Sequence, residues 1–153
     1  MKKVIKYFVP IILLTYLISC GTTKNVENVP DISEEESALF NETAGDTIQI
    51  ANEETEYEII IIEPGFNTWL LSIAKPEGYY SQSYLENRNQ LYVINWNQRV
   101  LNPQQYNRNL YEMQIDYSTG IDYGYEVNYK LYNYFIYFQR KYKQRLGPFL
   151  PRI

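Results

Sequence analysis

Four acidic side chains in the second half of the chain are close enough in sequence to form a catalytic pair of carboxylates. They are Glu112, Asp116, Asp122 and Glu126. Glycoside hydrolysis needs only two carboxylates about 5 to 10 Å apart. A structural role is the alternative, in which Asp116 and Asp122 shape the loop around Gly120. Glu126 would then favour a helix N-terminus. We expect the structural role, and a carboxylate-dependent hydrolase is the less favoured interpretation.

The residues of other common catalytic sites are missing. The chain has no histidine and a single cysteine, Cys20. This composition excludes Ser-His-Asp and Cys-His nucleophilic systems in the body of the chain, and it excludes the usual zinc ligand sets. No GxGxxG or GxxxxGK(S/T) loop occurs, so a phosphate-binding nucleotide site has no support. We therefore expect no metal, no cofactor and no enzymatic activity.

Aromatic side chains are better candidates for a binding surface. The chain has 17 tyrosines and two tryptophans, and rings with polar tips are typical of carbohydrate-binding and protein-binding surfaces. Tyr79 and Tyr80 follow Gly78 in a predicted turn, where we expect exposed rings. Trp69 and Trp96 complete the possible contact surface. The alternative is that these rings pack a loop onto the core.

A basic cluster lies near the C-terminus and consists of Arg140, Lys141, Lys143 and Arg145. Such a cluster could contact anionic lipid or nucleic acid. Basic residues at the end of a helix also complement the negative end of the helix dipole. Because an exported protein seldom meets nucleic acid, we expect the helix role and no nucleic-acid partner.

A short hairpin is predicted ahead of these residues. Residues 57–63 (YEIIIIE) contain four consecutive isoleucines and are followed by Pro64 and Gly65, which indicates a buried strand and a turn. Residues 47–50 (TIQI) alternate and could be the antiparallel partner, because one strand alone does not satisfy its own backbone.

Two helices should follow the hairpin. The first is short and ends before Pro76, because apolar residues recur with helical spacing at Phe66, Trp69, Leu70 and Ile73. The second should begin at Ser83, because residues 83–86 (SYLE) match a capping box, and it should end at Asn102 before a proline. Its apolar stripe consists of Leu85, Tyr92, Trp96 and Val100.

The last predicted helix starts at Asp122, its expected cap, and stops at Gly147 and Pro148. Two apolar rows run along it, so we expect it to be central to the fold. The first row is Tyr123, Val127, Leu131, Tyr134, Phe135, Phe138 and Tyr142, and the second is Tyr125, Tyr129, Tyr132 and Ile136. Residues 104–120 fit either a short helix or irregular coil.

Charge is divided unevenly along the chain. Residues 21–56 hold ten acidic residues and one basic residue, whereas residues 57–153 hold eight acidic and ten basic residues with 15 of the tyrosines. Few aromatic residues and high charge are typical of segments that do not fold alone. We therefore predict a mostly disordered acidic tether over residues 20–56. Residues 57–153 should form one small α+β domain, dominated by two longer helices with a short strand or hairpin.

The N-terminus has the features of an export signal. Lys2, Lys3 and Lys6 precede an apolar segment at residues 7–18. The run LISC at residues 17–20, followed by Gly21, resembles the lipobox of bacterial lipoproteins. That resemblance implies that residues 1–19 are a signal peptide and that Cys20 carries lipid after cleavage. An uncleaved membrane span is the alternative, but a helix over residues 7–19 would reach only about 20 Å of a core of about 30 Å.

The lipobox resemblance also implies a location. The protein would be exported and held by lipid on Cys20 in the cell membrane or the outer membrane. Gly21 stands where the inner-membrane retention signal of lipoproteins has Asp, which favours the outer membrane.

The rest of the chain resembles an uncharacterised family of small lipoproteins of Gram-negative bacteria that carry a domain of unknown function. The resemblance rests on EYEIIIIEPGFNTWL at residues 56–70, YYSQSYLENRNQLYVINWN at 79–97 and IDYGYEVNYKLYNYF at 121–135. It implies no activity. We expect a non-catalytic envelope component that binds another protein, and the alternative is a glycan-binding module that uses Tyr79, Tyr80, Trp69 or Trp96.

Overall fold

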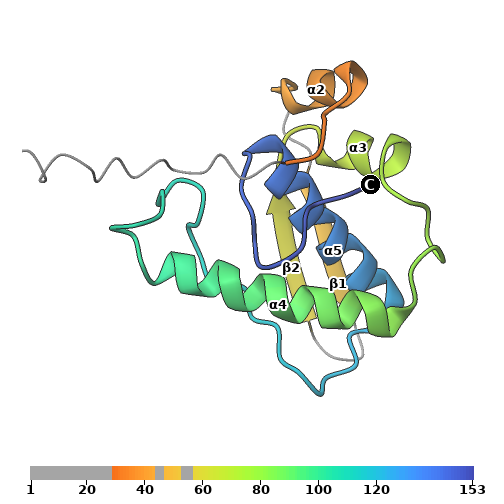
Figure 1. Ribbon diagram of the computed structural model, residues 1–153. Coiled ribbons are helices and arrows are strands. Elements are labelled where there is room, and N and C mark those ends of the chain that lie inside the picture. The colour runs from red at the N-terminus through yellow and green to blue at the C-terminus, as the bar shows by residue number, and fades with distance from the viewer. Residues whose placement is uncertain (1–28, 44–46, 53–56) are drawn as a thin grey trace, which may run out of the picture.

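The computed structural model describes residues 29–43, 47–52 and 57–153. Within these ranges the chain forms four helices and one two-stranded antiparallel sheet, so the predicted α+β class is confirmed. The two long helices are α4 (Gln82–Val100) and α5 (Gly124–Lys141), and α5 lies between α4 and the sheet (Figure 1). The predicted signal segment and Cys20 lie outside the described residues. None of the described helices is long and apolar enough to cross a membrane.

The predicted hairpin is confirmed, but its second strand is only half buried. Strand β1 (Thr47–Asn52) pairs with β2 (Tyr57–Ile62), and Ile50 lies opposite Ile59. Side chains alternate between the two faces of a strand, so a run of four isoleucines must direct two of them away from the core. Ile61 is buried, whereas Ile60 and Ile62 are 58% and 70% exposed. The prediction of a buried strand is therefore wrong for one face of β2.

The first predicted helix is confirmed as α3 (Phe66–Ser72). Phe66 and Trp69 are fully buried, and Leu70 and Ile73 are half-buried on the same side. Gly65 precedes the helix with a φ of 81°, a left-handed conformation that favours glycine. The hydroxyl of Tyr137 donates to the carbonyl oxygen of Pro64 at 2.6 Å and fixes this turn against α5.

The predicted start of α4 is wrong by two residues. The cap is Ser81 instead of Ser83, and its side-chain oxygen accepts a hydrogen bond from the backbone amide of Tyr84 at 3.2 Å. Both serines stand ahead of the same apolar stripe, so the local pattern fits either cap. The end is confirmed, since the helix stops at Val100 just before the predicted Asn102.

Helix α5 is central, as predicted. Most residues of both predicted rows are buried, and Tyr125, Tyr134 and Tyr142 are half-buried. The predicted cap is displaced by one residue: Tyr123 occupies the cap position, and the Asp122 carboxylate accepts the amide of Gly124 at 2.9 Å. Residues 102–123 contain turns and irregular backbone only, which settles the open choice at 104–120.

The acidic segment contains two elements that belong to the folded domain. Helix α2 (Glu34–Phe40) packs on α3, and β1 lies in the sheet. The prediction of a disordered tether over residues 20–56 is therefore wrong for residues 29–43 and 47–52, and the domain boundary at residue 57 is too late. Glu36 of α2 is fully buried, and a buried carboxylate needs a cation or hydrogen-bond donors beside it.

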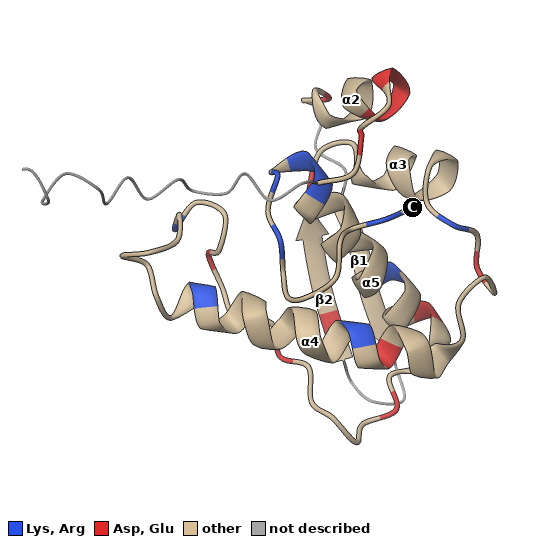
Figure 2. Cartoon of the chain, viewed as in Figure 1, with Lys and Arg blue, Asp and Glu red and all other residues tan. Residues whose placement is uncertain are grey.

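That cation is Arg140, near the C-terminal end of α5. Its guanidinium contacts both carboxylate oxygens of Glu36, each at 2.5 Å, and Glu36 and Arg140 are 0% and 1% exposed. Trp69 Nε1 donates to the same carboxylate at 2.9 Å. Arg140 also donates to the carbonyl oxygens of Pro151 and Asp31, so it joins both ends of the described chain. Figure 2 shows the acidic start of α2 close to the basic end of α5.

Candidate functional site

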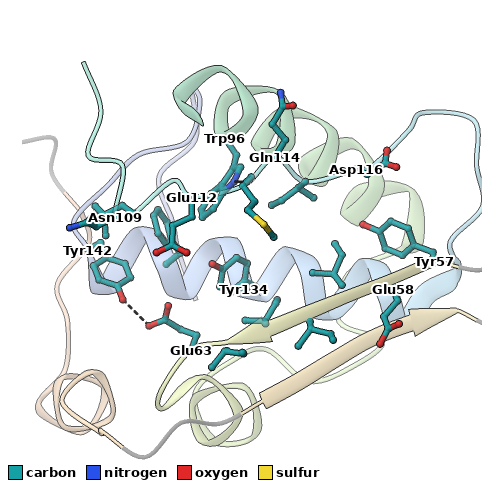
Figure 3. Close-up of a pocket in the computed structure, with 18 residues that line it drawn as sticks. Tyr57, Glu58, Glu63, Trp96, Asn109, Glu112, Gln114, Asp116, Tyr134 and Tyr142 are labelled. Atoms are coloured by element: carbon teal, nitrogen blue, oxygen red, sulfur yellow. Dashed lines mark hydrogen bonds between the residues drawn. The ribbon is translucent and has the colours of Figure 1, made fainter. Parts of the chain in front are cut away.

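A groove of about 700 Å³ runs along β2 and is the candidate site. We call it the β2 groove. One wall is β2, on the side that faces away from β1, and the other wall is the irregular segment 109–116 (Figure 3). Helices α4 and α5 supply the floor through Trp96, Tyr134 and Phe138.

The wall at residues 109–116 is held in place by side chains of α4. Trp96 Nε1 donates to the carbonyl oxygen of Met113 at 2.8 Å. The Asn97 side chain donates to the carbonyl oxygen of Ile115 at 2.9 Å and accepts its amide at 2.8 Å. These bonds satisfy backbone groups as a neighbouring strand would, so this wall has a defined position without regular structure.

The wall formed by β2 is an open strand edge. The sheet of the described residues has two strands, so the edge of β2 away from β1 carries backbone groups without a strand partner. Ile60 and Ile62 are exposed on this strand, and Met113 on the opposite wall is 76% exposed. Open, apolar strand edges are sites at which another chain can pair.

Tyrosine hydroxyls of the groove stay protonated. Burial, followed by the nearby Tyr123 and Asp116, raises the pKa of Tyr57 well above its ordinary value. Burial and the neighbouring Glu63 likewise raise the pKa of Tyr134. Because these phenols remain neutral at physiological pH, they are available as hydrogen-bond donors and do not act as phenolate bases.

The groove is acidic. Its lining includes Glu58, Glu63, Glu112 and Asp116, and no lysine or arginine is among the described residues that line it. Glu63 is neutralised by Lys141 at 2.7 Å and accepts the hydroxyl of Tyr142 at 2.9 Å.

The remaining carboxylates differ in their contacts. Glu58 accepts the side-chain amide of Gln49 at 2.7 Å. Glu112 and Asp116 are exposed and make no hydrogen bond or ion pair with any described residue. These two carboxylates, together with Glu58, whose partner is neutral, therefore give the groove a negative charge that no described cation pairs with.

The predicted carboxylate set is divided by the fold. Glu112 and Asp116 line the groove, whereas Asp122 and Glu126 do not. Asp122 accepts hydrogen bonds from Gln82 and from a backbone amide, and Glu126 forms an exposed ion pair with Lys130 at 2.6 Å. Glu126 also lies in the first turn of α5, the helix N-terminus predicted for it, and Asp122 holds the backbone amide of Gly124 just ahead of that turn. Among the described residues, no group of three or more His, Cys, Asp or Glu side chains could hold a metal ion.

The predicted aromatic surface is also divided. Trp69 and Trp96 are both buried, so neither ring stands exposed beside Tyr79 and Tyr80, although Trp96 lies in the floor of the β2 groove. Tyr79 is 60% exposed, and Tyr80 is half-buried with its ring stacked on that of Tyr84 at 4.7 Å. Tyr79 lies edge-on to Tyr80, so the two rings form no flat platform.

The loop that carries Tyr79 and Tyr80 is tied to α5 by other tyrosines. Tyr125 accepts the amide of Gly78 at 2.6 Å, and its hydroxyl donates to the carbonyl oxygen of Tyr80 at 3.2 Å. Tyr129 donates to the carbonyl oxygen of Lys75 at 2.8 Å. The rings here mainly hold a loop on the core.

Sequence reasoning did not find the β2 groove. The available signal was the run of four isoleucines, because strand alternation requires two of them to leave the core. The opposite wall had no signal, since residues 109–116 lack periodicity.

Comparison with known proteins gives one family. A family model described as a family of unknown function (DUF6146) matches residues 7–149. Comparison with curated proteins and with solved structures gives no match. The matched range covers the hairpin, all four described helices and both walls of the groove. The chain therefore belongs to DUF6146, a family of unknown function.

Proposed function

We propose that this protein is a non-catalytic, lipid-anchored component of the cell envelope that binds another protein through the β2 groove. The observation that carries the proposal is the open edge of β2, with Ile60 and Ile62 exposed beside a positioned second wall. Exposed apolar side chains on a strand edge favour aggregation unless a partner covers them, so their presence beside a groove favours a binding role.

The groove suits binding better than catalysis. Its tyrosines are held neutral, and the chain offers no histidine for proton transfer. A glycosidase would need one carboxylic acid with a raised pKa in an apolar setting, but Glu112 and Asp116 are both exposed to solvent. Glycan binding is the alternative function, and the observation in its favour is the exposed ring of Tyr79.

The proposed anchor is a lipid on Cys20, supported by the basic start, the apolar segment and the run LISC at residues 17–20. Each buried methylene of an acyl chain contributes about 0.8 kcal/mol, so two or three chains would hold the protein permanently in a bilayer. Gly21 in place of Asp favours the outer membrane as the location.

Cys20→Ser is expected to abolish incorporation of a fatty-acid probe and to leave an unprocessed or released protein. The reason is that serine does not provide the thiol to which the lipid is attached. Metabolic labelling followed by electrophoresis of wild type and variant measures the effect. Undiminished labelling of the serine variant would rule out the anchor.

A photo-crosslinking side chain placed at Met113 is expected to capture one identified envelope protein in cells. Met113 is the most exposed apolar residue on the groove wall. The matched control is the same side chain at Leu71, which is 80% exposed on α3 and does not line the groove. A third position, Tyr79, tests the glycan alternative.

Mass spectrometry of the captured material decides between the two functions. Capture of the same protein from Met113 and not from Leu71 supports a protein-binding groove. Equal capture from both positions, or none from Met113, contradicts it. Capture of glycan alone, from Tyr79, would make carbohydrate binding the better account.

A further inference from the structure

We infer that the occupant of the β2 groove is an extended segment of the partner protein that pairs with β2 as a third strand and carries two basic residues four positions apart. The inference rests on the proposed function and adds the conformation and the charge pattern of the bound segment. Three observations support it: a strand edge that no described strand pairs with, the spacing of two carboxylates that bond to no described residue, and the charge of β2 itself.

The free edge determines the conformation. Backbone amides and carbonyls on the open side of β2 lie at the spacing that an added strand requires. An incoming strand gains main-chain hydrogen bonds, and alternate side chains enter pockets on either side. The apolar residues of that segment would contact Ile60, Ile62 and Met113, which are exposed without it.

The carboxylates determine the charge pattern. Figure 3 shows Glu112 at one end of the groove, with Glu63 on the opposite wall, and Asp116 at the other end near Tyr57. Four residues of extended chain span about 13 Å. Glu112 and Asp116 are four positions apart in a wall that is not helical, so we place the two cations at residues i and i+4 of a strand that runs along the groove. Residues at an even spacing also lie on the same face of a strand, so both cations can reach the same wall.

A second copy of this chain is a poor occupant of the groove. A second copy would bring Glu58 and Glu63, the acidic residues at the two ends of its own β2 run, into a groove that already holds Glu112 and Asp116. Like charges opposite each other destabilise a strand pair. Acidic residues at both ends of β2 thus disfavour pairing between copies and favour a cationic partner.

Fluorescence anisotropy with three labelled peptides tests the inference on the full-length protein in detergent. The basic peptide contains KVTVK between polar flanks. The acidic peptide has EVTVE in the same place, and the third is the basic peptide with alternate backbone amides N-methylated on the pairing edge. We expect the basic peptide to bind at least about tenfold more tightly than either of the others, a preference of roughly 1.4 kcal/mol.

Charge-reversed variants connect that binding to the two carboxylates. Glu112→Lys combined with Asp116→Lys should weaken the basic peptide about tenfold or more and strengthen the acidic one. The matched control is Glu42→Lys with Glu77→Lys, which makes the same change of charge at two exposed positions outside the groove. The control should change either affinity by less than about twofold, because distant surface charges are screened.

Several results would overturn the inference. Equal affinity for basic and acidic peptides would remove the charge pattern, and undiminished binding of the N-methylated peptide would remove strand pairing. A loss in the control variant as large as in the groove variant would show only a general charge effect. A dimer in sedimentation that the groove variant dissociates would identify a second copy as the occupant. Capture of a protein from Met113 with no binding of the basic peptide would refute this inference and leave the proposed function standing.

Discussion

Arg140→Met is expected to lower the free energy of unfolding by about 3–5 kcal/mol, the range found when one partner of a buried ion pair is removed. The substitution leaves the carboxylate of Glu36 buried with Trp69 Nε1 as its remaining side-chain donor. It also removes the donors to the carbonyl oxygens of Pro151 and Asp31. Urea denaturation followed by circular dichroism measures the loss. Since domains of this size are stabilised by about 5–15 kcal/mol, the variant should remain measurable.

Two further variants distinguish a buried charge from a general loss of packing. Glu36→Gln should cost less than Arg140→Met, because Arg140 keeps two backbone carbonyl acceptors and the amide oxygen can still accept from it. The double variant Glu36→Leu with Arg140→Met removes both charges and should recover most of the stability. If the double variant lost as much stability as the sum of the single variants Glu36→Leu and Arg140→Met, the ion pair would not be the cause.

Gly65→Ala is expected to destabilise the domain by about 2–5 kcal/mol. A left-handed backbone costs a residue with a Cβ about 1–2 kcal/mol, and overpacking at a rigid contact costs about 1–3 kcal/mol. A Cβ at position 65 would overlap the carbonyl oxygen of Leu39 and approach the hydroxyl of Tyr137 at 3.0 Å. The turn before α3 therefore has no room for a side chain beneath α2.

Gly78→Ala is the matched control, because its φ of 82° is almost that of Gly65 and nothing lies within 4 Å of its Cβ position. Gly78→Ala should lower the free energy of unfolding only by the cost of a left-handed backbone, about 1–2 kcal/mol. Thermal and urea unfolding of both variants give the comparison. Equal losses of stability in the two variants would mean that the close approach of Gly65 to Leu39 of α2 adds no cost beyond that of the backbone conformation.

The sequence predicted the elements whose signals are local. The two rows of apolar residues along α5 predicted both the helix and its central position, because a helix that is apolar on more than one side must be covered on more than one side. The alternation in residues 47–50 and the turn signals at residues 64 and 65 predicted the strands. The start of α4 was displaced by two residues, since Ser81 and Ser83 are both able to cap it and packing decides between them.

The candidate site depended on contacts that sequence spacing does not contain. Glu112 and Asp116 were identified as chemical candidates, but only the fold brings them opposite an open strand and separates them from Asp122 and Glu126. The sequence does not show whether a tryptophan is exposed, because exposure depends on the whole fold, and both tryptophans were therefore left as candidates for the contact surface. Trp69 is instead buried against Glu36, a residue 33 positions away.

The sequence alone determined the hairpin, α3, α4 and α5 and the apolar side of each of these helices, because those properties depend on neighbouring residues and on the repeat of the backbone. It also excluded the histidine-dependent and cysteine-dependent chemistries of the body of the chain. Tertiary structure decided that α2 and β1 belong to the domain, because Glu36 of α2 pairs with Arg140, 104 residues away, and β1 pairs with β2 and buries Ile48 and Ile50. Tertiary structure also formed the β2 groove, because the open edge of β2 becomes one wall of a groove only when the distant residues 109–116 are held beside it.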